Sequence, residues 1–274
     1  MCLLAFGWRP RPGLRLALVG NRDEFHARPT AALHAWPETT GVYAGRDLQA
    51  GGTWCGVGPG GRVAALTNFR CMNAPPADAP SRGELVSGFL QGSATAEDQA
   101  RALQAKAHRY AGFSLLLVDA NEAWVVSNRM PAARSLEPGV YGLSNALLDT
   151  PWPKLLRSRA ALRQALGTGI TDPRELATLL FDTTPPTMEE AEDEQAMTSA
   201  AANDDGALLQ HFKERYGEAF VNAMAAPFVL DHRYGTRATT TIVVPESGMG
   251  DILEWQYAAD GTRSGEQHFR FEVA

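Results

Sequence analysis

The residues of this chain with the clearest capacity for chemistry lie close to its start, where Cys2 follows Met1 and "NRD" occupies positions 21–23. If Met1 is removed, Cys2 carries both a thiol and the free α-amino group, and the reference pKa values of these two groups differ by less than about 1 unit. The amine can then accept the proton of its own thiol, which makes an amino-terminal nucleophile independent of a histidine base. The alternative is that Cys2 is a small buried strand residue and that "NRD" is a polar turn.

The element that must position these residues is a predicted β-hairpin. Two strand-forming runs, "CLLAFGW" and "LRLALVG", flank "RPRPG", whose Pro and Gly content predicts a tight turn. A turn near residues 11 and 12 pairs residues whose numbers sum to about 23, which places Cys2 opposite Asn21 and beside Arg22 and Asp23. The hairpin therefore predicts a cluster of a thiol, an amino terminus, a guanidinium and a carboxylate.

Further strand-forming runs and helical patterns follow in blocks. The predicted strands cover 53–58 and 62–68 around "GPGG", 113–119 and 122–128 around "ANE", 139–146, and three runs within 238–273. Apolar residues at helical spacing predict helices over 81–91, 95–112, 151–167 and 172–182. Ser81 and Glu84 have the spacing of a capping box, and Thr95 is the predicted cap of the second helix.

Hairpins interleaved with helix pairs favour an α+β layered architecture, and we expect one domain over residues 1–274. The segment 183–206 is rich in acidic residues, contains proline and lacks an apolar period, which predicts a solvated loop or lid.

Composition and charge exclude several classes of protein. With 45% hydrophobic and 20% charged residues the chain is globular, and a net charge of -6 lacks the basic excess that nucleic-acid binding usually needs. The 3 cysteines and 6 histidines show no disulfide or metal-site spacing, so we expect no metal and no required cofactor. The absence of a secretory signal or a long apolar run predicts no membrane span and a cytoplasmic location. Oligomeric state has no signal in the sequence.

Five motifs in order resemble the NRDE family, also called the transport and Golgi organisation protein 2 family, over nearly the whole chain. They are "GNRDEFHARPT", "GGTWCGV", "GRVAALTNFR", "YGLSNALLDTPWPK" and "YGTRATTTIVV". That family is similar in turn to the Cys-type N-terminal-nucleophile hydrolases of the choloylglycine hydrolase and penicillin V acylase group. The resemblance implies an αββα four-layer sandwich.

The same resemblance assigns roles to residues of the motifs. It implies Cys2 as the nucleophile and Asp23 as the carboxylate near the amine. Asn68 in "LTNF" and Asn145 in "LSNA" correspond to the oxyanion and amine-side asparagines. Arg237 in "GTRATTT" corresponds to a late active-site arginine. A single Asn at the end of a strand more often stabilises a turn. The prediction of a site therefore rests on all five residues together.

Four further residues lie outside this set. Asn21 and Arg22 are expected to bind substrate, although the hydrolases carry Arg before Asn and two residues before Asp, which leaves the orientation of Arg22 open. Cys55 and Cys71 match no catalytic position, and we expect both to pack in the core.

The sequence is compatible with two functions. The first is hydrolysis of an amide or related acyl bond through a Cys2 thioester after Met1 removal. The second, implied by the resemblance, is non-catalytic binding and trafficking of haem or of a lipid or acyl-CoA in the same pocket. No histidine stands in a recognisable haem-ligation motif, so haem is only a candidate transported ligand. Under either function the partner is a small amide, acyl or haem-like molecule.

Overall fold

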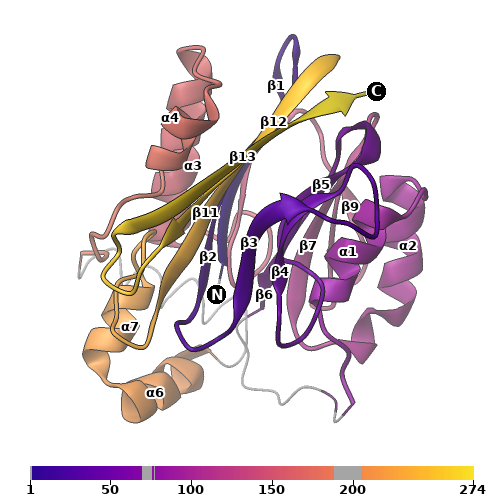
Figure 1. Ribbon diagram of the computed structural model, residues 1–274. Coiled ribbons are helices and arrows are strands. Elements are labelled where there is room, and N and C mark those ends of the chain that lie inside the picture. The colour runs from indigo at the N-terminus through magenta and orange to yellow at the C-terminus, as the bar shows by residue number, and fades with distance from the viewer. Residues whose placement is uncertain (1, 70–75, 77, 188–204) are drawn as a thin grey trace.

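The computed structural model describes residues 2–69, 76, 78–187 and 205–274. Two antiparallel sheets pack face to face, and helices cover the outer face of each sheet (Figure 1). This order of layers confirms the αββα sandwich that the family resemblance implies.

The first sheet has six strands in the order β10-β1-β2-β11-β12-β13. Their bounds are β1 Cys2–Arg11, β2 Leu14–Phe25, β10 Gly139–Leu143, β11 Tyr234–Pro245, β12 Gly248–Tyr257 and β13 Arg263–Val273. The predicted first hairpin and the three late strands are therefore confirmed. Because β2 pairs with β11, residues 14–25 and 234–245 lie side by side in the centre of this sheet although they are far apart in the sequence.

The second sheet has seven strands that run in sequence order from β3 to β9. They are β3 Thr30–Ala35, β4 Tyr43–Asp47, β5 Cys55–Gly58, β6 Arg62–Asn68, β7 Phe113–Val118, β8 Ala123–Ser127 and β9 Arg134–Ser135. The hairpins around "GPGG" and "ANE" are confirmed as β5–β6 and β7–β8, with the 3-10 turn η1 (Pro59–Gly61) inside the first.

Two pairs of helices complete the layers. The helices α1 (Gly83–Gln91) and α2 (Ala96–Lys106), with η2 (Ala107–Arg109), cover the seven-stranded sheet. The helices α3 (Pro153–Gly167) and α4 (Pro173–Thr178) cover the six-stranded sheet, and α6 (Asp205–Tyr216) and α7 (Glu218–Met224) precede β11.

One of the two predicted helix caps is confirmed and the other is wrong. Thr95 caps α2 as expected, since its hydroxyl accepts the amide hydrogen of Asp98. The predicted capping box at α1 is wrong: Ser81 accepts from the Gly83 amide, and the carboxylate of Glu84 accepts from the Tyr110 hydroxyl instead.

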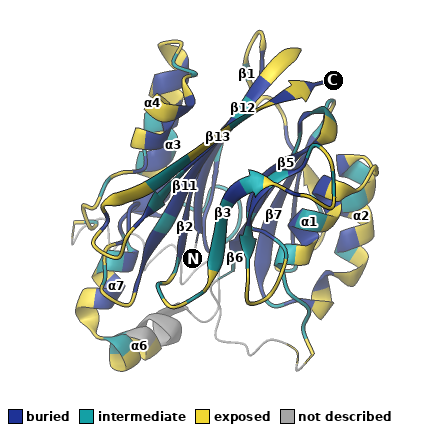
Figure 2. Cartoon of the chain, in the orientation of Figure 1, coloured by how far each residue is buried: buried dark blue, intermediate teal, exposed yellow. Residues whose placement is uncertain are grey.

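Apolar side chains fill each space between layers. The space between the two sheets holds Leu4, Phe6, Leu18, Val57, Leu116 and Ile252, among others. Figure 2 shows that the strands in the interior are largely buried, while the outward sides of the helices are exposed. The central strands are covered on both faces, which explains why "CLLAFGW" and "LRLALVG" are continuous apolar runs rather than alternating ones.

The register of the first hairpin differs from the prediction by one residue. Cys2 pairs with Arg22, and Asn21 pairs with Leu3. The register shifts between Trp8 and Arg11, where Arg9 has a φ of 40°, and the turn uses the residues at 12 and 13 rather than 11 and 12. A one-residue slip moves side chains to the opposite face, so Arg22 shares a face with Cys2 and Asn21 does not.

Most of the predicted lid lies outside the described residues, because only 183–187 and 205–206 of the segment 183–206 are described. Cys71 also lies outside them. Within the described ranges, no helix is both long and apolar enough to cross a membrane. Those ranges also contain no group of three or more His, Cys, Asp or Glu residues that could hold a metal ion.

Candidate functional site

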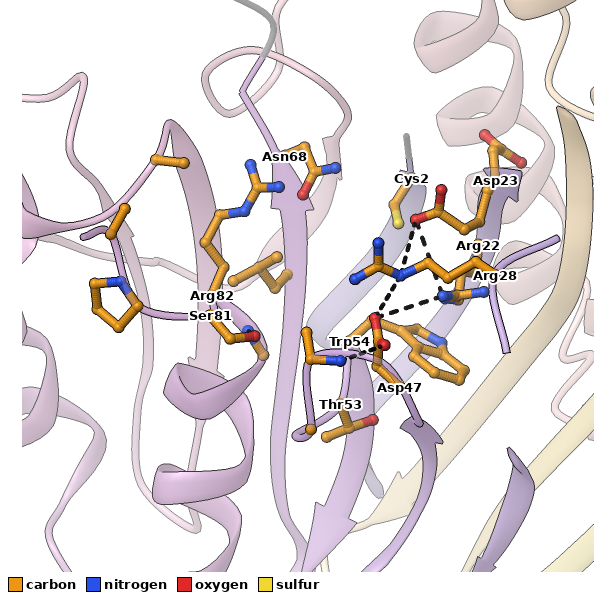
Figure 3. A pocket seen from close by; sticks show the side chains of 18 residues that line it. Cys2, Arg22, Asp23, Arg28, Asp47, Thr53, Trp54, Asn68, Ser81 and Arg82 are labelled. Atoms are coloured by element: carbon orange, nitrogen blue, oxygen red, sulfur yellow. Dashed lines mark hydrogen bonds and ion pairs between the residues drawn. The ribbon is translucent and has the colours of Figure 1, made fainter. Parts of the chain in front are cut away.

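At one end of the sandwich, the two sheets and the start of α1 enclose a cavity of about 300 Å³. Its walls come from the start of β1, the end of β2, the end of β4 with the following loop, the end of β6 and the residues that begin α1. Figure 3 shows Cys2 and Arg22 on one side of this cavity, with Asn68 and Arg82 on the other. The polar lining residues are Cys2, Arg22, Asp23, Glu24, Arg28, Asp47, Thr53, Trp54, Asn68, Ser81 and Arg82.

Cys2 lies at the inner end of this cavity and is 9% exposed. Its backbone carbonyl accepts a hydrogen bond of 3.2 Å from the Ser144 hydroxyl, which ties β1 to the end of β10. Burial raises the pKa of the Cys2 thiol and the charge of Asp23 adds to this, while Arg22 acts in the opposite direction. The thiol is therefore protonated at neutral pH and needs a base before it can attack a substrate.

Arg22 is the charged residue directly opposite Cys2, and only 5% of its side chain is exposed. Its guanidinium carbon stacks 4.4 Å from the centre of the Trp54 ring. The Nη2 atom lies 3.9 Å from Asp47 and 4.0 Å from Glu24, which is too far for a hydrogen bond. Among the described residues the Nη1 atom has no hydrogen-bond partner. The structure thus answers the open question of orientation: Arg22 faces the cavity.

An ion-pair cluster fixes the rim beside Arg22. Arg28 Nε lies 2.8 Å from Asp47 Oδ2 and 3.8 Å from Glu24 Oε2. Asp47 Oδ1 accepts the amide hydrogens of Gln49 and Ala50, both at 3.0 Å. Burial alone would raise the pKa of Asp47, but the Ala50 amide and the Arg28 guanidinium outweigh it, so the pKa is lowered. Asp47 therefore anchors the loop that carries Thr53 and Trp54.

Asp23 is buried near the end of β2. Its Oδ1 atom accepts a 2.7 Å hydrogen bond from the Thr236 hydroxyl. Burial raises the pKa of Asp23, whereas the positive charges of Lys154 and Arg22 favour the ionised form. Lys154 is itself buried and donates to the carbonyl of Met224 at 3.0 Å. The sequence motif "PWPK" contained this lysine, but its spacing gave no sign that it acts on Asp23.

Of the two predicted asparagines, only Asn68 lines the cavity among the described residues, and Asn145 lies behind it. Asn68 lines the cavity, at the end of β6. Asn145 is fully buried and donates from Nδ2 to the backbone carbonyl of Asn68 at 3.2 Å. Its Oδ1 atom lies 3.4 Å from the Ser144 hydroxyl, which also bonds to Cys2. Asn145 therefore connects the backbones on either side of the cavity, and Asn68 is the one that reaches the cavity.

Asn21 is not among the described residues that line the 300 Å³ cavity. Its Nδ2 donates to the carbonyls of Leu180 at 3.2 Å and Pro227 at 2.9 Å, and its Oδ1 accepts from Thr239 at 2.6 Å. These contacts lie on the face of the sheet opposite Cys2. The side chain of Asn21 is therefore engaged in structural hydrogen bonds, where the sequence had predicted contact with substrate.

Arg237 also lies outside the lining of the cavity, as far as the described residues show. It is the extra residue where the pairing of β11 with β2 shifts between Thr236 and Ala238. Its Nη1 atom donates to the carbonyls of Phe25 at 3.2 Å and His26 at 3.0 Å. Arg237 thus clamps the end of β2 and does not enter the cavity. Cys55, in contrast, is buried between the sheets as expected for a packing residue.

Residues that sequence reasoning did not identify come from the second sheet and from α1. Asp47, Trp54 and Arg82 all line the cavity, but they follow no spacing relative to Cys2. Trp54 belongs to the motif "GGTWCGV", which carries the family resemblance, but the resemblance assigns no role to this residue.

Comparison with known proteins agrees with the five motifs. The family model described as Transport and Golgi organisation 2 matches residues 1–259. The Transport and Golgi organization 2 homolog of Mus musculus is 34% identical over 262 residues, which cover 90% of each chain. The corresponding protein of Homo sapiens is 33% identical over 264 residues, again with 90% of each chain covered.

Among solved structures, a mutant of the conjugated bile acid hydrolase from Clostridium perfringens superposes with a TM-score of 0.45 at 12% sequence identity. The superposition covers 99% of this chain and 92% of that one. The family match extends over almost the entire sequence. Cys2, Asp23 and Asn68, to which the resemblance assigns roles, line the same cavity. The chain belongs to the Transport and Golgi organisation 2 family.

Proposed function

We propose that this protein hydrolyses an amide or other acyl bond, with Cys2 as an amino-terminal nucleophile after removal of Met1. The observation that carries the proposal is that the Cys2 side chain shares one cavity with Arg22, Asp23 and Asn68. The resemblance of the motifs to Cys-type N-terminal-nucleophile hydrolases supports the same chemistry.

The first step is proton transfer within Cys2. Because burial raises the pKa of the thiol, the α-amino group of the processed chain must remove its proton. The resulting ammonium group is compensated by Asp23, whose carboxylate is held by the Thr236 hydroxyl. The thiolate then attacks the carbonyl carbon of the substrate, a C–S bond forms, and the carbonyl electron pair moves onto oxygen.

The second requirement is stabilisation of that oxyanion. The Asn68 side-chain amide is a donor available in the cavity, and Asn145 holds the Asn68 backbone in place. Loss of one such donor typically costs about 2.7–4 kcal/mol of transition-state stabilisation. When the tetrahedral intermediate collapses, the ammonium returns its proton to the leaving amine and a Cys2 thioester remains. A water molecule, deprotonated by the same amine, cleaves the thioester and releases the carboxylic acid.

Both described cysteines, Cys2 and Cys55, are free thiols, and a reducing compartment keeps thiols in this state. We therefore propose the cytosol as the location of the active protein.

A second candidate function retains the cavity without the chemistry: the protein would carry haem or an acyl-CoA. The observation in its favour is that Arg22, Arg28 and Arg82 line the cavity, since propionate and phosphate groups are anionic. Among the described lining residues there is no histidine, so ligation of haem iron would fall to Cys2. Titration with haem or acyl-CoA tests this function. The absence of both a Soret shift and thermal stabilisation would remove it.

The hydrolase proposal is tested by intact-mass analysis of the purified protein, followed by reaction with an electrophilic amide or lactone probe. We expect the active chain to lack Met1 and to gain one probe adduct. Cys2→Ala should remove the adduct, and the matched control Cys55→Ala should retain it, because Cys55 is buried between the sheets. Retention of Met1 in the active protein, or unchanged labelling of Cys2→Ala, would contradict the proposal.

A further inference from the structure

We infer that Trp54 is a positioning residue for Cys2: its ring, packed against Gly45, holds the guanidinium group of Arg22 opposite the thiol. The role of Cys2 as a nucleophile rests on the proposed function, whereas the contact of Trp54 with Arg22 stands on the geometry of the cavity. The inference has a measurable consequence, because a displaced Arg22 should make the Cys2 thiol harder to ionise.

The guanidinium group of Arg22 makes no hydrogen bond within the described part of the chain. Its side chain is 5% exposed, and its Nη2 atom lies 3.9 Å from Asp47 and 4.0 Å from Glu24. Its Nη1 atom has no hydrogen-bond partner among the described residues. The ring of Trp54 covers one face of the group, with its centre 4.4 Å from the guanidinium carbon, which is a cation–π contact. Figure 3 shows this ring beside Arg22, on the same side of the cavity as Cys2.

The two carboxylates near Arg22 are shared with a second arginine. Asp47 is bonded to Arg28 at 2.8 Å, and Glu24 lies 3.8 Å from the same Arg28 nitrogen. Their attraction for Arg22 is therefore divided, and it acts over distances too long to fix the direction of a side chain. A planar guanidinium stacked on a rigid ring is fixed in its plane, so the contact with Trp54 decides where Arg22 points.

The place of the Trp54 ring depends on the absence of a side chain at Gly45. A Cβ atom added at Gly45 of β4 would lie 2.6 Å from Cζ2 of Trp54 and closer still to its Cη2 atom. Gly45 does not have a positive φ, so this position requires space and not an unusual backbone conformation. The backbone of Trp54 is fixed as well, since its carbonyl accepts the amide hydrogen of Leu66 at 2.8 Å.

The contact joins the two sheets beside Cys2. Cys2 and Arg22 are directly opposed on β1 and β2, and such pairs have Cβ atoms about 4.5–5.5 Å apart. Gly45 belongs to the second sheet, and Trp54 immediately precedes its strand β5. Trp54 and Cys2 also line a second cavity, of about 10 Å³, so the two residues border the same spaces twice. The second sheet therefore supplies the group that holds Arg22 against the first.

Charged and titratable groups face the Cys2 thiol from several elements. They are the amino terminus, Arg22, Asp23 and Glu24 of β2, Arg28 of the loop that follows, Asp47 of β4, Cys55 of β5 and Arg82 before α1. Burial raises the pKa of the Cys2 thiol, the amino terminus and Arg22 lower it, and Asp23 and Glu24 raise it. If the guanidinium of Arg22 moves away, the two carboxylates are less compensated and the thiolate is disfavoured.

The test is the rate at which iodoacetamide alkylates Cys2 over a range of pH, measured by mass spectrometry of the amino-terminal peptide. Because the thiolate is the form that reacts, the pH profile of this rate reports the pKa of the thiol. Trp54→Ala should slow alkylation at a fixed pH by about three- to tenfold, which corresponds to a rise of about 0.5–1 unit in the pKa. A ring with a merely structural role would give the opposite result, because its removal would admit water and reagent to the thiol.

Matched variants separate the ring, its packing and its partner. Trp54→Phe keeps an aromatic face and should keep most of the parental rate. Trp255→Ala removes another partly buried tryptophan that stacks on an arginine, at 4.8 Å from Arg263, but is not among the described residues that line the cavity, so it should keep the parental profile. Gly45→Ala should displace the ring and shift the profile in the same direction as Trp54→Ala. Gly88→Ala should not, since an added Cβ there meets nothing within 4 Å.

A double-mutant cycle identifies Arg22 as the intermediary. In an Arg22→Gln background, Trp54→Ala should give no further shift, because the charge that the ring positions is already lost. Circular dichroism checks that each variant is folded, and Gly45→Ala carries the test if Trp54→Ala is not. An unchanged or lowered pKa in Trp54→Ala and Gly45→Ala, a full shift in the Arg22→Gln background, or failure of iodoacetamide to reach Cys2 in every variant would overturn the inference.

The two proposals can fail separately. A raised thiol pKa in Trp54→Ala, in a protein that retains Met1 and forms no acyl adduct, would support the role of Trp54 and remove the hydrolase. An acyl adduct on Cys2 together with an unchanged profile in Trp54→Ala would sustain the hydrolase and remove the inference.

Discussion

Replacement of Asn21 distinguishes a structural residue from a substrate-binding one. The sequence predicts contact with substrate, whereas the structure gives this side chain three buried hydrogen bonds on the opposite face of β2. Asn21→Ala removes the donors to the carbonyls of Leu180 and Pro227 and the acceptor for Thr239. Both carbonyls belong to segments that pack over the outer face of the six-stranded sheet.

The expected magnitude follows from the number of polar groups left without partners. Asn21 is 1% exposed, so water does not replace the lost bonds without rearrangement. Each buried polar group that loses its partner costs about 1–3 kcal/mol. The Thr239 hydroxyl keeps its hydrogen bond from Tyr257, so only the two carbonyls lose their side-chain donor, and we expect a total of about 2–6 kcal/mol. This is a large part of the stability of an ordinary domain.

The assay is urea denaturation followed by circular dichroism, with Asn68→Ala as the matched control. Asn68 carries the same side chain at the edge of the cavity, and Asn145 bonds to its backbone carbonyl rather than to its side chain. Asn68→Ala should change the free energy of unfolding by less than about 1 kcal/mol. It should slow the reaction of Cys2 with an acyl substrate by about 10²–10³-fold, as loss of an oxyanion donor does. A stable Asn21→Ala protein that has lost substrate binding would refute the structural interpretation.

Three further predictions concern the loop beside the cavity and the buried thiol. Gly52→Ala should destabilise the protein by about 1–3 kcal/mol more than Gly51→Ala. Both have positive φ, but only at Gly52 does an added Cβ meet backbone, 2.5 Å from the carbonyl carbon of Gly83. Equal thermal shifts for the two variants would count against this close approach. Asp47→Asn should destabilise the protein at neutral pH, and this difference should shrink on acidification. The pKa of Asp47 is below its ordinary value of 3.8, so the carboxylate stabilises the fold above that value and ceases to do so as the pH falls through the folded-state pKa. Denaturation curves that give the same difference at every pH would argue otherwise. Cys55 should resist alkylation in the native protein, because burial strongly raises the pKa of its thiol, and peptide mapping that finds modified Cys55 before unfolding would contradict its burial.

The sequence indicated the central layers of the fold well because their strands are long, apolar and bounded by Gly and Pro. The strands β3, β4 and β9 were not predicted, since β3 and β4 are only partly buried and β9 has two residues. The helix expected over 172–182 is shorter in the structure, where α4 ends at Thr178. In each case the outcome depends on tertiary packing that no local pattern contains.

The site was predictable to the extent that its residues belong to motifs. Cys2, Asp23 and Asn68 line one cavity, whereas the positions of Asn21 and Arg22 depended on the register of a single hairpin. That register is set by the turn at residues 12 and 13 together with the irregularity between Trp8 and Arg11, and the turn sequence alone reveals neither. The second wall of the cavity comes from another sheet, and its residues have no fixed spacing from the first.

We propose that Cys2 is the amino terminus and the nucleophile of the mature protein. The most direct test of this proposal is mass spectrometry of the amino-terminal peptide after the protein has been trapped with an activated acyl donor. We expect a peptide that begins at Cys2 and carries the acyl group on its sulfur. A reactive protein whose peptide still begins with Met1, or one that carries the acyl group on another residue, would contradict the claim.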